Sequence, residues 1–231
     1  MNAHERRSVM CGSVCPGSPA LICGLLLLCF SSGCGAFRGA GEMLSGNTAL
    51  KNAQKMEDPA SADSRREGMQ FLADHEYGHH PPYTTRYQQI AAKDPDPLVR
   101  AVAVRSLNIS RDHSDEAGKV FVAALADSSP LVRLEGAKAL YRLPNQAAVE
   151  RLLAMAASND ETKDNRIAAA EALQHYRRLD VGRTLISLLN QRDFGIAWQA
   201  RRTLKRLTGK DLNYDESAWL NYITGPSKPL G

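Results

Sequence analysis

The sequence has no cysteine after position 34. All five cysteines fall in the first 34 of its 231 residues, so the rest of the chain can hold neither a disulfide framework nor a thiolate metal site. Aromatic residues make up 6% of the chain, and only two of them are tryptophans. The sequence also has no glycine-rich phosphate loop and no serine or cysteine nucleophile motif. The common signatures of nucleotide-dependent and acyl-transfer enzymes are therefore missing.

A strong excess of charge of one sign is also missing. The chain has 29 basic and 25 acidic residues, a net charge of +4. A dedicated nucleic-acid-binding protein normally shows a basic stripe, so nucleic acid is not an expected partner. Basic residues gather only late in the chain, where they form a solvated helix face or dock an acidic partner or anionic lipid headgroups: Arg177, Arg178, Arg183, Arg201, Arg202, Lys205 and Arg206. The 43% hydrophobic content is ordinary for a folded protein.

The N-terminal region contains an apolar run at residues 20–30. A run of this length is too short for a membrane span, which needs about 20 apolar residues. Arg6 and Arg7 precede the run, and the small residues Ser31, Ser32 and Gly33 follow it. A basic start, a short apolar core and a small-residue exit are typical of a secretory signal peptide. We therefore expect residues 1–33 to be an export signal.

Cys34 follows the apolar run directly, and the stretch SSGC resembles a bacterial lipobox, although Ser31 stands where the usual leucine would be. The resemblance implies that Cys34 is lipidated and becomes the new N-terminus, with residues 34–46 as a flexible tether. The protein would then be exported to the cell envelope and lipid-anchored to a membrane, facing the periplasm. An ordinary signal peptide cut near residues 33–36 and a short uncleaved anchor are the alternatives.

The body of the chain repeats itself with a step of 33 residues. The step relates aspartates, arginines, leucines and small residues, respectively: Asp94, Asp127, Asp160 and Asp193; Arg100, Arg133 and Arg166; Leu107, Leu140 and Leu173; Ala103, Gly136 and Ala169. A period of this size is typical of a solenoid, in which each unit buries its apolar face by stacking on its neighbours.

Capping residues and helical apolar spacing divide the body into helices. Asp96 and Ser129 each stand before a proline at the first helical position, and Thr162 is the third cap. The fold class is therefore all-α, an α-solenoid of about five helix pairs with a C-terminal capping helix that carries Trp219. We expect this domain at 47–224, with a frayed tail at 225–231. The expected pairs and the cap lie at about 47–76, 83–108, 115–142, 146–176, 180–207 and 213–224.

The pattern D-P-L-V-R-x-x-A-x-x-x-L at Asp96–Leu107 returns as S-P-L-V-R-x-x-G-x-x-x-L and resembles HEAT repeats, especially the short bacterial HEAT-like type. The resemblance covers about Asn47–Leu207. It implies that the recurrent residues form a structural ladder between repeats rather than a catalytic site. The carboxylates would come from Asp94, Asp127, Asp160 and Asp193, and the guanidinium groups from Arg100, Arg133 and Arg166; Gln199 breaks the series at the fourth place.

One stretch suggests metal chemistry. His75-Glu76-x-x-His79 matches H-E-x-x-H, in which two histidines bind zinc and the glutamate activates water. That mechanism needs a continuous helix, whereas Gly78 and the prolines after His80 end any helix here. No third ligand follows at the usual spacing. A zinc-dependent hydrolase is therefore the alternative, and His79 with His80 could also bind a metal adventitiously.

The leading hypothesis is a membrane-tethered scaffold or protein-binding module without catalytic activity, which offers the concave face of its solenoid to a protein partner. No motif calls for a cofactor. Some HEAT-like proteins are lyases that attach bilin pigments to light-harvesting proteins, and this is a second enzymatic alternative on the same fold. An exported lipoprotein would be in the wrong compartment for that reaction.

Overall fold

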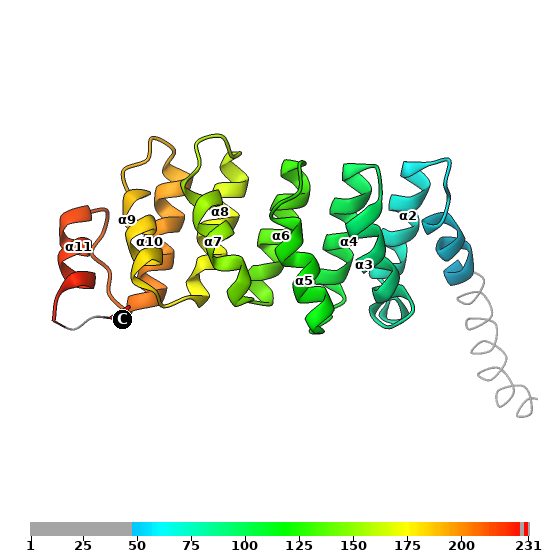
Figure 1. Ribbon diagram of the computed structural model, residues 1–231, viewed down its shortest axis with the longest axis horizontal. Coiled ribbons are helices and arrows are strands. Elements are labelled where there is room, and N and C mark those ends of the chain that lie inside the picture. The colour runs from blue at the N-terminus through cyan, green and yellow to red at the C-terminus, as the bar shows by residue number, and fades with distance from the viewer. Residues whose placement is uncertain (1–47, 227–228, 231) are drawn as a thin grey trace, which may run out of the picture. The chain divides into compact units, whose positions relative to one another are not determined.

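The computed structural model of the protein describes residues 48–226 and 229–230, all within the unit Asn47–Gly231. The predicted signal peptide, Cys34 and the tether at 34–46 lie outside the described residues. The described part contains helices and no β-strand. Within it, the helices form pairs that stand side by side in a row (Figure 1). The predicted all-α solenoid of about five HEAT-like pairs is confirmed.

Each pair consists of a first and a second helix. The first helices lie at residues 48–56, α3 (Tyr83–Lys93), α5 (Asp115–Ala124), α7 (Val149–Ala157) and α9 (Leu179–Ser187). The second helices are α2 (Ala62–Ala73), α4 (Pro97–Ile109), α6 (Pro130–Arg142), α8 (Lys163–Ala172) and α10 (Phe194–Thr208). Three short 3-10 helices and the final helix complete the described chain: η1 (Glu76–His79), η2 (Gln146–Ala148), η3 (Leu173–His175) and α11 (Glu216–Thr224).

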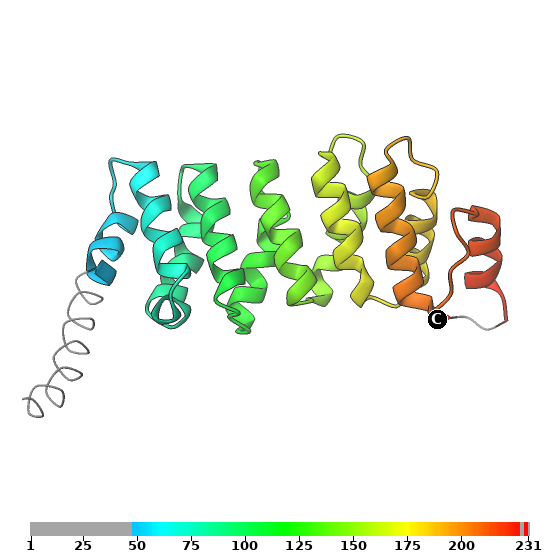
Figure 2. The same ribbon diagram turned by 180° about the vertical axis from the view of Figure 1, so that it is seen from behind.

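The second helices pack directly on one another from α2 to α10 (Figure 2). Small residues permit this close stacking and the equally close approach of the two helices within a pair. A Cβ atom added to Gly136 of α6 would lie 2.8 Å from the Cβ of Ala124 in α5, closer than carbon atoms approach in a packed core. Behind the small residues, Leu107, Leu140 and Leu173 are fully buried. The 33-residue period thus marks the packing layer.

Side-chain caps begin several second helices, as the sequence predicts. The Asp96 carboxylate accepts hydrogen bonds from the amides of Leu98 (2.8 Å) and Val99 (3.0 Å), and the Thr162 hydroxyl caps α8. Ser129 occupies the N-cap position of α6, but its side chain makes no capping hydrogen bond. Instead, Asp127 accepts a hydrogen bond from the Ser129 amide at 2.8 Å and holds the turn two residues earlier.

The C-terminal end of the row is closed by α11, which packs against α9. Trp219 is fully buried, and its indole nitrogen donates to the carbonyl of Asn213 at 2.9 Å. The expectation of a frayed tail is wrong at residues 229–230. Leu230 is buried beside Gly182 of α9, and the Arg177 guanidinium donates to the carbonyl of Pro229 at 2.8 Å. The tail returns because it supplies an apolar side chain that α11 leaves unfilled.

Candidate functional site

A line of charged side chains joins the turns between first and second helices. Arg100 donates through Nε and Nη2 to both carboxylate oxygens of Asp127, at 2.8 Å each. Its Nη1 donates to the carbonyls of Asp94 (2.9 Å) and Pro95 (3.2 Å) in its own turn. One guanidinium therefore connects its own turn to the turn of the following repeat.

The same arrangement recurs on either side of this pair, with partners that the 33-residue step does not identify. Arg65 donates to both oxygens of Asp94, at 2.8 and 2.9 Å. Arg133 donates to both oxygens of Glu161, at 2.7 and 3.0 Å, and not to the neighbouring Asp160. Asp160 is exposed, and its amide donates to the Ser158 hydroxyl.

The predicted ladder does not extend to Asp193. This residue is the N-cap of α10 and accepts from the Gly195 amide at 2.8 Å. Lys163, an exposed side chain, is its ion-pair partner at 3.1 Å. Arg166 is buried and donates to the carbonyl of Ala156 (3.1 Å) and to the side-chain oxygen of Gln191 (3.2 Å). A neutral amide thus takes the place of the last carboxylate.

The reason is a shift of register. The caps Asp96, Ser129 and Thr162 are 33 residues apart, but the next cap is Asp193, only 31 residues after Thr162. Counted from this cap, the arginine position of α10 is Ala197, and Gln199 lies on the buried side of the helix. Counting from the caps, rather than following one residue type, identifies Gln191 and Ala197 from the sequence.

The ladder carboxylates are held in their charged form. Hydrogen bonds from Arg100 keep the pKa of Asp127 below its ordinary value. For Glu161, burial raises the pKa, but hydrogen bonds from Arg133 and Asn165 lower it further, so the net direction is down. Carboxylates whose oxygens are occupied by guanidinium groups are poor general bases. The chemistry of this line suits fastening rather than catalysis.

The His75-Glu76-x-x-His79 motif does not lie within a helix. Helix α2 ends at Ala73, and the motif follows it as an extended residue and the 3-10 helix η1. The His75 ring contacts the carbonyl of Phe71 and the His79 ring that of Ala73, both at 2.7 Å. The motif residues and His80 do not form a metal-binding cluster, and residues 48–226 and 229–230 contain no group of three or more potential ligands arranged to hold a metal ion.

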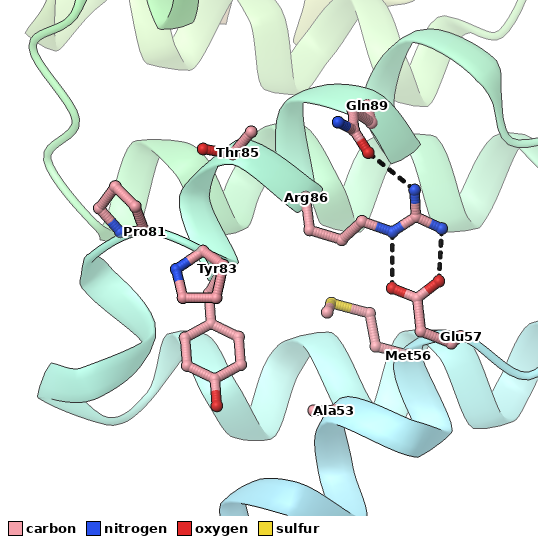
Figure 3. A pocket seen from close by; sticks show the side chains of 9 residues that line it. Ala53, Met56, Glu57, Pro81, Tyr83, Thr85, Arg86 and Gln89 are labelled. Atoms are coloured by element: carbon pink, nitrogen blue, oxygen red, sulfur yellow. Dashed lines mark hydrogen bonds and ion pairs between the residues drawn. The ribbon is translucent and has the colours of Figure 1, made fainter.

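A groove of about 700 Å³ lies between helix 48–56 and α3 (Figure 3). Met56, Tyr83 and two prolines give it an apolar lining. At one side, the Arg86 guanidinium pairs with both carboxylate oxygens of Glu57 and donates to the side-chain oxygen of Gln89 at 2.8 Å. Because the charged groups satisfy one another, the groove offers an apolar surface without a free charge from this pair.

A second exposed surface lies on the second helices. Of the large hydrophobic side chains that are exposed in the described part of the chain, four belong to these helices. Leu98 and Leu131 occupy the same position of α4 and α6, two residues after the cap, and are 41% and 46% exposed. Phe194 and Trp198 of α10 are 69% and 46% exposed. We call these four residues the apolar row.

The structure separates the late basic residues into paired and open groups. Arg177 donates to backbone carbonyls, Arg178 pairs with Glu150 and Asp180, and Arg201 pairs with Asp211. Arg202 has only a distant partner, Glu171 at 3.8 Å. Its guanidinium lies over the Trp198 ring, 5.1 to 5.5 Å being a normal range for such a contact and 5.3 Å the value here. The open cations therefore adjoin the C-terminal end of the apolar row.

The described helices include none that is long and apolar enough to span a membrane. Residues 86–174 match the family model described as HEAT repeats, which supports a HEAT-repeat protein. No curated protein matches the sequence. Among solved structures, human deoxyhypusine hydroxylase in complex with glycerol is similar at 21% identity with a TM-score of 0.48. The match covers 71% of this chain and 63% of the hydroxylase chain, less than two thirds of its length.

The comparison with the hydroxylase corrects one expectation. An enzyme is among the structures similar to this chain, which contradicts our expectation that the protein has no catalytic activity. We withdraw that expectation. The similarity assigns no reaction and no catalytic residue to this chain. Within the described residues, no observation favours the zinc hydrolase or the bilin lyase.

Proposed function

We propose that the protein is an interaction scaffold whose second helices bind a protein partner along the apolar row. HEAT repeats commonly serve as extended binding surfaces because stacked helices present equivalent positions at regular intervals. The match of residues 86–174 to HEAT repeats supports this class of function.

The observation that carries the proposal is the exposure of Leu98 and Leu131 at one position of successive repeats. Each leucine stands on the outer side of the first helical turn, where a polar residue would serve the helix as well. The equivalent residue of α8 is Asp164, which is exposed. Apolar side chains that do not contribute to their own core, and that lie on neighbouring elements, are typical of protein contact surfaces.

Site-specific photo-crosslinking in the host cell tests this proposal. A photoreactive amino acid is placed at Leu98 or Leu131 in the full chain, and at Lys119 of α5 or Arg151 of α7 as matched controls. All four positions are exposed except that the leucines lie on second helices. We expect one discrete crosslinked protein from the leucine positions and none from the controls. Equal products from all four positions, or none from any, would contradict the proposal.

We also propose that the scaffold is tethered to a membrane of the cell envelope through a lipid on Cys34. The support comes from the sequence alone: an apolar run at residues 20–30, then Ser31, Ser32 and Gly33 before the cysteine. Two or more acyl chains give stable membrane anchoring, whereas a single chain of myristoyl length is marginal.

Metabolic labelling with a radioactive fatty acid tests the tether. The parent protein should carry the label and sediment with membranes, and Cys34→Ala should lose both properties. Cys29→Ala is the matched control, because it removes a cysteine from the predicted signal peptide and should leave the label unchanged. Persistent labelling of Cys34→Ala would show that the anchor assignment is wrong.

A further inference from the structure

One side of α10 carries an exposed stripe that the fold does not need. Phe194, Trp198, Arg202 and Lys205 follow one another at spacings of four, four and three residues, which places them on one face of the helix. The opposite face supplies the buried residues, including Ile196, Ala200 and Leu204. The stripe is therefore directed away from the core.

Trp198 is the residue in which α10 departs most from its counterparts. Five residues after the cap, α4 has Ala101, α6 has Leu134 and α8 has Ile167, all buried or half-buried. At this position α10 has a tryptophan that is 46% exposed. A large aromatic side chain in water gains little from its own fold, but exposed tryptophan and arginine are the residues that most often dominate binding to a partner.

A hollow of about 220 Å³ adjoins this tryptophan and is lined by Trp198, Arg201, Arg202, Lys205 and Asp211. Three of these five side chains are cationic and one is acidic. Asp211 already accepts from Arg201 through both oxygens, at 2.9 Å each, and from Lys205 at 3.3 Å. Arg202 is left with the contact to Glu171 at 3.8 Å and with the Trp198 ring. The hollow thus has more positive charge than its own carboxylate neutralises.

Arg202 is also oriented by its surroundings. Its guanidinium lies 5.3 Å from the centroid of the Trp198 ring, and contact of this kind restricts the side chain without using its hydrogen-bond donors. A guanidinium with free donors pairs with a carboxylate through two parallel hydrogen bonds. The size of the hollow suits individual side chains, whereas a flat membrane surface would not enter it.

We propose that this hollow binds an acidic segment of the protein partner, in which a carboxylate side chain pairs with Arg202 and Lys205 and a neighbouring apolar side chain packs on Phe194 and Trp198. The inference rests on the proposed scaffold function and specifies the chemistry of the partner. Charge complementarity selects the acidic residues, and the exposed aromatic rings select the apolar one.

The test is a binding titration of the full-length protein with a short fluorescent peptide composed of glutamate and phenylalanine. A peptide with glutamine in place of glutamate is the matched probe. We expect the acidic peptide to bind, and Arg202→Gln or Trp198→Ala to weaken it at least about tenfold. Arg183→Gln, which removes an exposed cation from α9, should leave the affinity unchanged. The exposed positions allow these variants to fold, which circular dichroism checks.

Three outcomes would overturn the inference. The first is no binding of the acidic peptide, and the second is an equal loss in Arg202→Gln and Arg183→Gln, which indicates non-specific charge attraction. The third is a preference for phosphatidylglycerol over phosphatidylcholine vesicles that disappears in Arg202→Gln without any peptide binding, which assigns the hollow to the membrane. Crosslinking at Leu98 and Leu131 is independent of this hollow, so it separates failure of the inference from failure of the scaffold proposal.

Discussion

Arg100 illustrates how a single side chain connects two repeats. Its guanidinium contacts Asp127 in the following turn and two backbone carbonyls in its own turn. The side chains of Arg100 and Asp127 are only 14% and 15% exposed, so water screens the pair less than it screens a surface ion pair. We propose that the role of this ladder is structural, and two measurements at the residue scale test it.

Replacement of Arg100 by leucine should destabilise the protein by about 2–3 kcal/mol, somewhat less than the loss for a fully buried pair. The variant leaves the Asp127 carboxylate and the carbonyls of Asp94 and Pro95 without their donor. Lys163→Leu is the control, because its pair with Asp193 is exposed, and it should cost less than about 1 kcal/mol. Urea unfolding followed by circular dichroism gives both values. Equal losses would contradict a special role for the ladder.

Stability should also fall in acid because of Asp127. Its pKa is lowered in the folded protein, so the unfolded chain binds more protons as the pH decreases. The stabilisation is present at neutral pH and is lost as the pH falls below about 5. Asp127→Asn should cost about 1–3 kcal/mol at pH 7, and its difference from the parent should shrink towards pH 3. A difference that is independent of pH would show that the carboxylate charge does not contribute.

At the scale of helices, contact distance is set by residues without side chains. In Gly136→Val, the new side chain would meet Ala124 and the carbonyl of Phe121, forcing α5 and α6 apart. We expect a loss of about 1–3 kcal/mol from overpacking. Gly118→Ala in α5 is the matched control: its added Cβ meets only the flexible side chain of Asn145 at 3.2 Å. Thermal unfolding of the two variants should therefore differ clearly, with the control near the parent value.

The η1 segment shows how local structure decides whether a motif becomes a site. Histidines four residues apart share one face only within a continuous helix. Because α2 ends at Ala73, the rings of His75 and His79 are held by backbone carbonyls of the preceding helix instead. The spacing of the letters was compatible with zinc; the backbone between them is not helical in the way that zinc binding requires.

For the whole molecule, a solenoid transmits stability mainly between neighbours. Leu230 completes the C-terminal end by packing on α9 although it lies far along the chain. Leu230→Ala should therefore loosen α9 and α11 and leave α4 and α6 unaffected. Hydrogen exchange measured by mass spectrometry would show faster exchange confined to the C-terminal helices. Uniformly faster exchange along the row would contradict this local role and indicate a single cooperative unit.

The sequence by itself determined the fold class, the helix pairs and the C-terminal cap, because a helical apolar face without a core of its own must stack on a neighbour. The caps, the glycine that ends α10 and the recurring leucines each follow from local rules. The sequence also indicated the anchor at Cys34, which lies outside the described residues and stays a prediction.

Only the tertiary structure decided which charged residues meet. Glu161 rather than Asp160 reaches Arg133, and Asp193 caps α10 because the preceding turn is two residues shorter. A side chain's partner depends on where the neighbouring turn places its backbone, and a repeat interval does not contain that information. The same holds for Leu230 and for the hollow beside Trp198, since both are formed by residues that come together only when α9, α10 and the C-terminal segment have packed.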